Sequence, residues 1–217
     1  MTVPSKLVRY YAQRANEYEK VYLKPERQQD IVRLKVLLRD LLRDYQILEV
    51  ACGTGYWTTV IAEVATSIVA TDINAEVLRI AQDKQLSTQK VQFVQADAFS
   101  LSTAQGVFTA GLAGFWWSHI LKSQLGQFLD VFHAKLASRA LVVFTDNTYV
   151  EGSNHPITRV DAEGNTYQQR RLENGKLYEV LKNFPDESEF QRILGARASN
   201  LRYERLTYYW CLSYTLE

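Results

Sequence analysis

Apolar residues recur at helical spacing early in the chain and then give way to short apolar runs. Between residues 28 and 44 they return every three or four positions, which is typical of an amphipathic helix with a solvated polar face. Further on, the apolar runs alternate with segments of helical spacing, and this alternation predicts an α/β fold with a mostly parallel sheet and helices on both faces. The predicted strands are 47–50, 68–70, 91–94, 107–112 and 140–144, and the helices between them are 57–65, 75–85 and 122–137.

The alternation of strands and helices ends after the fifth predicted strand. Two turn signals, Ala162 to Asn165 and Glu173 to Lys176, flank short strand-like stretches and predict a β-hairpin insertion over 148–183. A last helix at 186–194 then precedes two strands, 201–206 and 208–216, which we expect to pair antiparallel at the sheet edge. The whole sheet would have seven strands with an antiparallel last strand. No Pro/Gly-rich linker divides the chain, so we expect one domain over 1–217.

The amino-acid composition and net charge limit the kinds of partner that the protein is expected to bind. The net charge of +1 leaves no electrostatic footprint for nucleic acid or an anionic membrane, so we expect neither partner. The two cysteines, Cys52 and Cys211, form no CxxC pair, and no metal-ligand cluster is visible. The start of the chain has no apolar run and nothing approaches the length of a membrane span, so we expect a cytoplasmic protein. These features do not indicate an oligomeric state.

The strongest local signal is the run from Leu48 to Thr58, where a buried strand passes through small residues directly into a helix. Gly53 and Gly55 allow the backbone to approach a ligand closely, and the helix start behind them offers free amides. Glu49 is costly to bury without a partner, and a ligand with an ammonium group would provide one. A dinucleotide fingerprint needs a third glycine, but Thr58 stands there.

Two further carboxylates fall at the ends of the second and third predicted strands, where ligands bind in open α/β sheets. Asp72 suits the ribose diol of a dinucleotide and equally that of another nucleoside-containing cofactor. Glu49 together with Asp97 favours a cationic amino acid part over a pyrophosphate. Taken alone, each aspartate would more often be a helix cap.

With these motifs the sequence resembles the class I S-adenosylmethionine-dependent methyltransferases. The resemblance rests on Glu49-x-Ala51-Cys52-Gly53-x-Gly55, Thr71-Asp72-Ile73-Asn74 and Gln95-Ala96-Asp97-Ala98-Phe99. It implies a Rossmann-like sheet and S-adenosyl-L-methionine as cofactor. The family often has glycine where Ala51 and Tyr56 stand.

The resemblance also implies roles for these positions. The glycine loop would hold the methionine part of the cofactor, Asp72 would bind the ribose and Ile73 would lie against the adenine. Asp97 would accept from the adenine amino group beside Ala98 and Phe99. A lid helix within 1–27 would place two tyrosines over the methionine end, and the loop after the fourth strand would touch the cofactor. The corresponding residues are Tyr11, Tyr18 and Gly114.

Candidates for chemistry on the acceptor are less defined. The family usually has an acidic or amide residue in the fourth strand, but Thr109, Ala110 and Gly111 stand here. His119 is then the best general-base candidate, because its free pKa lies near neutrality, although it could equally be structural. Asp146 could orient substrate or assist a base, or be a turn residue. Candidate substrate contacts are Trp116, Trp117, Tyr149 and Arg170, the last because strand alternation sends one of Arg170 and Arg171 inward.

The sequence therefore predicts methyl transfer to an O, N or C atom of a small molecule under a cap formed by 1–27 and 148–183. Two alternatives stay open: methylation of a protein or peptide, and a catalytically silent cofactor-binding module that serves a partner protein. A nicotinamide oxidoreductase is a weaker alternative.

Overall fold

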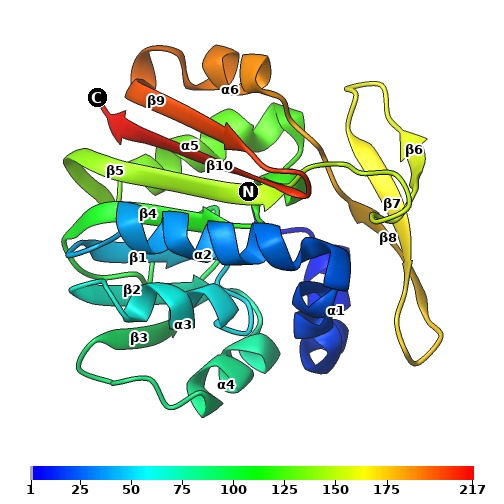
Figure 1. The fold of residues 1–217 in the computed structure, drawn as a ribbon, viewed down its shortest axis with the longest axis horizontal. Coiled ribbons are helices and arrows are strands. Elements are labelled where there is room, and N and C mark those ends of the chain that lie inside the picture. Colours follow the sequence, from blue (N-terminus) through cyan, green and yellow to red (C-terminus); the bar gives the residue numbers. More distant parts are fainter. Residues whose placement is uncertain (1) are drawn as a thin grey trace.

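A computed structural model describes residues 2–217 and contains a central seven-stranded sheet (Figure 1). The strand order is β3-β2-β1-β4-β5-β10-β9. The first five strands in this order pair parallel, whereas β10 runs antiparallel to both β5 and β9. The strands span β1 Gln46–Val50, β2 Ser67–Asp72, β3 Val91–Gln95, β4 Phe108–Gly114, β5 Leu136–Asn147, β9 Ala198–Arg205 and β10 Tyr209–Leu216. The predicted α/β class, the seven strands and the antiparallel last strand are confirmed.

Helices cover both faces of this sheet, as the sequence predicts. One face packs against α2, α3 and Leu78 of α4, and the other packs against α1, α5 and α6. Their apolar stripes form two cores separated by the sheet, and both cores contain fully buried leucine side chains. The helices span α1 Ser5–Arg14, α2 Gln28–Leu41, α3 Tyr56–Ala62, α4 Ala75–Asp83, α5 Leu125–His133 and α6 Glu187–Leu194.

Short 3-10 helices connect several of these elements. The longest, η1, continues α1 without a break and carries Tyr18 and Tyr22. Their bounds are η1 Ala15–Leu23, η2 Pro25–Arg27, η3 Trp117–His119, η4 Lys122–Gln124 and η5 Gly195–Arg197.

The helix predicted over 122–137 ends early, at His133, and β5 begins at Leu136. The apolar residues of the two elements run together in the sequence, so their spacing hides this boundary. Close packing holds the α5 ring of Phe132 against β4, because a side chain at Gly111 would stand 2.6 Å from that ring. A glycine is therefore required at this position of β4.

The insertion after β5 is a second, three-stranded antiparallel sheet, in which two hairpins share the middle strand. Its strands are β6 Ile157–Val160, β7 Thr166–Arg171 and β8 Leu177–Leu181. The two predicted turns join them, but β6 is exposed along its whole length and has no buried face that would reveal it as a strand. Figure 1 places this sheet beside α1, beyond the ends of the parallel strands.

Side chains join the N-terminal helices to the insertion. The Tyr178 hydroxyl donates to Gln13 at 2.7 Å, Lys20 pairs with Glu173, and the Glu173 amide donates to Glu17. Together the N-terminal helices (α1 and η1) and the insertion (β6 to β8) cover the carboxyl ends of the parallel strands, and we call this cover the roof. Within residues 2–217 no helix has the length and apolarity that crossing a membrane requires.

Candidate functional site

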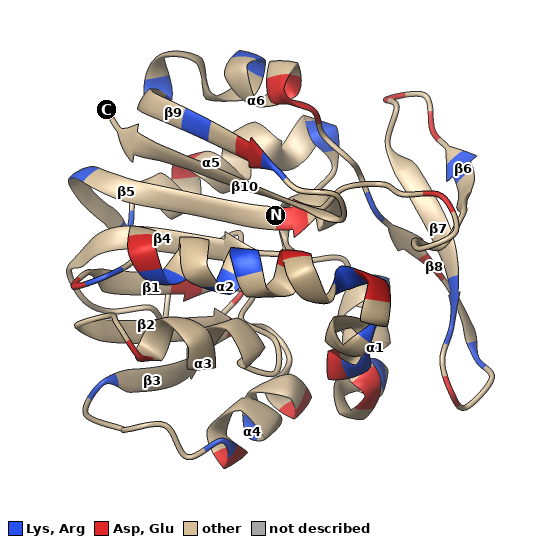
Figure 2. Ribbon diagram, in the orientation of Figure 1, with Lys and Arg blue, Asp and Glu red and all other residues tan. Residues whose placement is uncertain are grey.

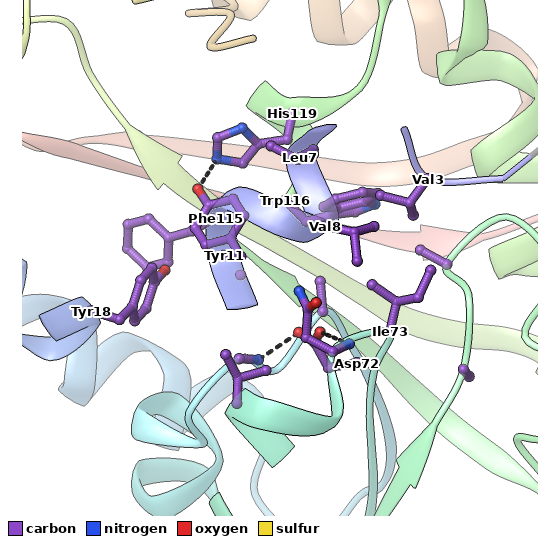
Figure 3. Close-up of a pocket in the computed structure, with 17 residues that line it drawn as sticks. Val3, Leu7, Val8, Tyr11, Tyr18, Asp72, Ile73, Phe115, Trp116 and His119 are labelled. Carbon is purple, nitrogen blue, oxygen red and sulfur yellow. Dashed lines mark hydrogen bonds between the residues drawn. The ribbon is translucent and has the colours of Figure 1, made fainter. Parts of the chain in front are cut away.

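Two cavities lie under this roof. The first, of about 60 Å³, lies over the carboxyl ends of β1, β2 and β4 and is closed above by α1 and η1. Its lining is mostly apolar, with Asp72 and Asn74 as polar groups from the loop after β2 (Figure 3). Of the residues that the sequence analysis assigned to the cofactor, those that line it are Tyr11, Tyr18, Ala51, Gly53, Asp72, Ile73, Ala98 and Gly114.

The loop between β1 and α3 has the left-handed backbone that its glycines suggest. Gly53 and Gly55 have φ angles of 56° and 75°, and Ala51 also has a positive φ, of 55°. An alanine in this conformation is strained by about 1 kcal/mol, which accounts for the glycine often found there in the family. Tyr56 begins α3 and stacks on Tyr22 with ring centroids 4.2 Å apart, so the other family glycine is not required.

Asp72 organises the floor of the first cavity. One carboxylate oxygen accepts the Gly53 amide at 3.0 Å and the other accepts the Asn74 amide at 2.9 Å (Figure 3). The carboxylate thus ties the glycine loop to the end of β2. Burial raises its pKa to about 6, and the two backbone amides oppose that shift.

Glu49 lies behind the glycine loop rather than on the cavity wall. Its carboxyl group is buried and accepts the Thr58 hydroxyl at 2.7 Å. Burial raises its pKa to about 8, with a smaller contribution from the charge of Asp72, so the group holds a proton at neutral pH. The sequence predicts a ligand's ammonium group as the partner of this buried carboxyl; in the structure its partner is the Thr58 hydroxyl.

The far end of the first cavity is apolar. Ile73 and Ala98 line it, together with Val3 and Leu7 of the N-terminal segment. Asp97 lies outside it, because its carboxylate oxygens accept the amides of Phe99 at 2.8 Å and of Val3 at 3.2 Å. Two other predicted residues also lie outside the lining: Phe99 packs against Trp116 and Phe128, and Gly55 is the N-cap residue of α3.

His119 is buried between the two cavities and lines both. Its Nδ1 lies 2.7 Å from the Leu181 carbonyl, which can only accept, so Nδ1 carries the proton. Its Nε2 therefore accepts from the Tyr11 hydroxyl, also at 2.7 Å (Figure 3). Burial, Lys182 and Arg170 hold the pKa of His119 well below its ordinary value, so the imidazole is neutral. Burial likewise raises the pKa of Tyr11.

Asp146 is fully buried at the end of β5 and forms an ion pair with Lys182, at 2.6 Å. It also accepts the Ser118 amide, and Lys182 donates to the Ser118 hydroxyl. Burial lowers the pKa of Lys182 to about 8. This network binds the insertion to the loop that carries His119, which makes Asp146 a positioning residue.

The second cavity, of about 260 Å³, lies between α1, η1 and the insertion. Arg170 faces it from β7 and is buried, whereas Arg171 is exposed, as strand alternation predicts. Two predicted substrate contacts lie outside both cavities: Trp117 packs in the core against Phe144 and Phe190, and Tyr149 packs against Phe184. Trp116 lines the first cavity rather than the second.

Sequence reasoning missed three of the residues at this site. Lys182 follows the apolar end of β8, where a lysine reads as the end of a strand. Phe115 lines both cavities with a φ of 60°, and no sequence pattern signals that conformation in a phenylalanine. Asn74 reads as a helix N-cap, yet its side chain makes no capping bond and lines the first cavity.

Comparison with known proteins finds a family-model match over part of the chain and a fold match over nearly all of it. Residues 47–139 match the family model described as "Methyltransferase domain". YqeM of Bacillus subtilis (strain 168) is 35% identical over 65 residues, which are 30% of this chain and about a quarter, 26%, of that protein.

Solved structures match over nearly the whole length. The DhpI–SAH complex has a TM-score of 0.79 at 22% identity and covers 99% of this chain and 97% of its own. The PH0226 protein of Pyrococcus horikoshii OT3 has a TM-score of 0.71 at 19% identity, covering 93% of this chain and 99% of its own. At these identities the likeness shows the fold.

Proposed function

We propose that this chain, a class I S-adenosylmethionine-dependent methyltransferase by its methyltransferase domain and its fold, moves a methyl group to an O, N or C atom of a small molecule. One observation carries the proposal: the two cavities share a wall. Four side chains line both of them, namely Tyr11, Tyr18, Phe115 and His119. A cofactor in the first cavity and an acceptor in the second would meet at this wall.

The first cavity fits an adenosyl cofactor. Asn74 Oδ1 and Trp116 Nε1 both lie in its lining, are buried, and have no hydrogen-bond partner among residues 2–217. Such groups are costly to leave unpaired, and a nucleoside supplies both donors and acceptors. The apolar end between Ile73 and Ala98 suits a flat base, and Asp72 suits a ribose diol. When bound, S-adenosylmethionine supplies an electrophilic methyl group on a sulfonium.

Tyr11, Tyr18 and Phe115 would enclose the transferred methyl group. Tyrosine and phenylalanine faces attract cations, so three rings at the shared wall would favour a sulfonium and exclude water. The Tyr18 ring lies beside the glycine loop, with its Cε1 atom 3.9 Å from the position that a Cβ atom on Gly53 would occupy. The chain's main contribution would be the orientation of the two reactants.

His119 would take the acceptor's proton by way of Tyr11 where the acceptor is a hydroxyl or an ammonium. Its Nε2 already accepts the Tyr11 hydroxyl at the shared wall, so the proton would pass through that hydroxyl or Tyr11 would have to swing aside. The imidazole is neutral, and its lowered pKa makes it a weak base. Leu181 fixes the tautomer, and Asp146 holds the His119 loop in place through Ser118. A thiolate or enolate acceptor would need no base.

The arrangement of the second cavity supports a small acceptor over a protein or peptide. Contacts between the N-terminal helices and the insertion, including Tyr178 with Gln13 and Lys20 with Glu173, bridge the two sides of the cavity. An extended polypeptide would have to pass between these bridged segments, whereas a small molecule would not.

Ligand-dependent melting tests the cofactor first. S-adenosylmethionine and S-adenosylhomocysteine, each at 100 times its dissociation constant, should add about 2.7 kcal/mol to the stability of the wild type. NAD and NADP should add nothing. Binding followed by transfer of labelled methyl from S-adenosylmethionine to a panel of small acceptors would establish the activity. Binding without any transfer, to small molecules or to peptides, would favour the silent module instead.

A further inference from the structure

The second cavity is strongly basic. Seven cationic side chains line it, against two acidic ones, Glu17 and Glu173. The cations come from both the N-terminal helices and the insertion. Figure 2 shows blue segments, with red ones among them, on both of these parts of the chain. The seven cationic side chains are Arg14, Lys20, Lys24, Arg27, Arg170, Arg171 and Lys182.

Only some of this charge is neutralised by the protein. Lys20 pairs with Glu173 and Lys182 pairs with Asp146, while Arg171 is exposed. The other four form no ion pair within residues 2–217, and Arg27 and Arg170 are buried, at 2% and 8% exposure. Burying a guanidinium without a counter-charge is unfavourable, so this lining favours a bound anion.

Arg14 and Arg170 flank the same tyrosine. Their guanidinium carbons lie 5.7 and 6.0 Å from the centre of the Tyr10 ring, and Arg14 donates to its hydroxyl. Arg170 donates to the Gln168 side-chain oxygen at 2.9 Å. None of these partners carries a negative charge. Arg27 differs, because Ser153 accepts its Nε and Nη2 and two tyrosine rings enclose it.

His155 lines the same cavity, and its pKa responds to the combined charge of the surrounding cations. Burial and then the charges of Arg170, Arg14, Lys24 and Arg27 lower its pKa to about 4. The four unpaired cations therefore act on one small volume, and His155 adds no further positive charge at neutral pH.

We propose that the second cavity binds its acceptor through a doubly charged oxyanion of the phosphate type, held by Arg14 and Arg170. A carboxylate would balance only one of four unpaired charges, and arginine pairs bind tetrahedral oxyanions through several parallel hydrogen bonds. The acceptor would then place its reacting atom at the wall formed by Tyr11 and His119. This inference rests on the proposed function, since it describes the acceptor of the same site.

Calorimetric titration with inorganic phosphate, at constant ionic strength and with acetate as the singly charged comparison, tests the anion site directly. We expect the wild type to bind phosphate and Arg170→Met to bind it at least about tenfold more weakly, with partial recovery in Arg170→Lys. If Arg170→Met impairs folding because Arg170 is buried, Arg14→Met at a half-buried position gives the same test. Arg202→Met, on the exposed face of β9, is the matched control and should bind as the wild type does.

Turnover then separates an acceptor's own oxyanion from a free phosphate ion. Phosphorylated compounds would be assayed beside their phosphate-free counterparts: glycerol 3-phosphate with glycerol, phosphoethanolamine with ethanolamine, and phosphoserine with serine. Methylation of phosphorylated members alone, lost in Arg170→Met, supports the proposal. Equal phosphate binding in wild type and Arg170→Met, tighter binding of acetate, or methylation only of phosphate-free compounds would overturn it. Failure of S-adenosylhomocysteine to bind would overturn the proposed function instead, and phosphate binding is measured without it.

Discussion

The two cavities that meet at Tyr11 and His119 are assembled in different ways. The first has a floor built by the ends of β1 and β2, where Asp72 and Asn74 lie close together in the chain, although its lining as a whole runs from Val3 to His119. The second draws on segments from Tyr10 to Tyr209, which lie far apart in the sequence. The first is mostly apolar with one organising carboxylate, and the second is basic. The contrast indicates that the scaffold builds the floor of the first cavity locally, whereas the N-terminal helices and the insertion build the second cavity from distant parts of the chain.

The largest expected effect is on the acceptor side. Lys182→Met would leave Asp146 buried and charged without a partner, and we expect unfolding to become easier by about 3–5 kcal/mol. Chemical denaturation measures the change. The exposed Lys176→Met in the β7–β8 turn should have little effect. Adding Asp146→Asn to Lys182→Met should restore much of the loss; no recovery would mean that the ion pair does not hold the insertion to the sheet.

On the cofactor side, Asp72→Ala removes the carboxylate that joins Gly53 and Asn74. We expect S-adenosylhomocysteine affinity to fall by at least about tenfold, since hydrogen bonds to charged groups contribute about 1.5–3 kcal/mol. Calorimetry measures it, with the exposed Asp83→Ala of α4 as control. Phosphate binding in the second cavity should persist. If both ligands were lost together, the two cavities would not be separable units.

Glu49→Gln tests the proton held behind the glycine loop. The pKa of Glu49 is raised from its ordinary value to about 8, so the folded state holds a proton that the unfolded state releases above its own lower pKa. Stability from this group is therefore lost as the pH rises toward 8. Relative to Glu49→Gln, the wild type should lose about 1.4 kcal/mol between pH 6 and pH 7. Denaturation curves for both proteins at the two pH values measure the difference. An unchanged difference would show Glu49 to be ionised in the native state.

The smallest effect is expected at Ala51. Ala51→Gly relieves a left-handed backbone at the floor of the first cavity and should stabilise the chain by up to about 1 kcal/mol, less the greater chain entropy of glycine. Ala62→Gly at the end of α3 is the contrasting substitution and should destabilise. Thermal melting distinguishes the two, and destabilisation by Ala51→Gly would argue that no strain is stored in the loop.

Much of the fold was predictable from local pattern. Burial on one or both faces imposes the spacing of apolar residues, so the five parallel strands, the final antiparallel pair and most helices follow from the sequence. The exceptions have physical reasons. The exposed strand β6 has no buried face, and the boundary between α5 and β5 falls inside one apolar stretch.

The residues of the candidate site likewise divide into those that a local pattern predicts and those that it does not. Gly53 and Asp72 were readable because backbone geometry and strand-end position determine what they do, and both depend on a few neighbouring residues. Whether Trp116 or Trp117 faces a cavity depends on one turn of η3, and the structure buries Trp117 in the core.

The sequence by itself determined the layered sheet, the glycine loop and the carboxylate after β2, because short-range spacing and backbone conformation suffice for each. Only the tertiary structure decided that Tyr11 meets His119, that Lys182 neutralises Asp146, and that Arg14 and Arg170 share one cavity. Those pairs are separated by 108, 36 and 156 residues along the chain, so no local pattern encodes them. They arise because the insertion and the N-terminal helices close over the same edge of the sheet.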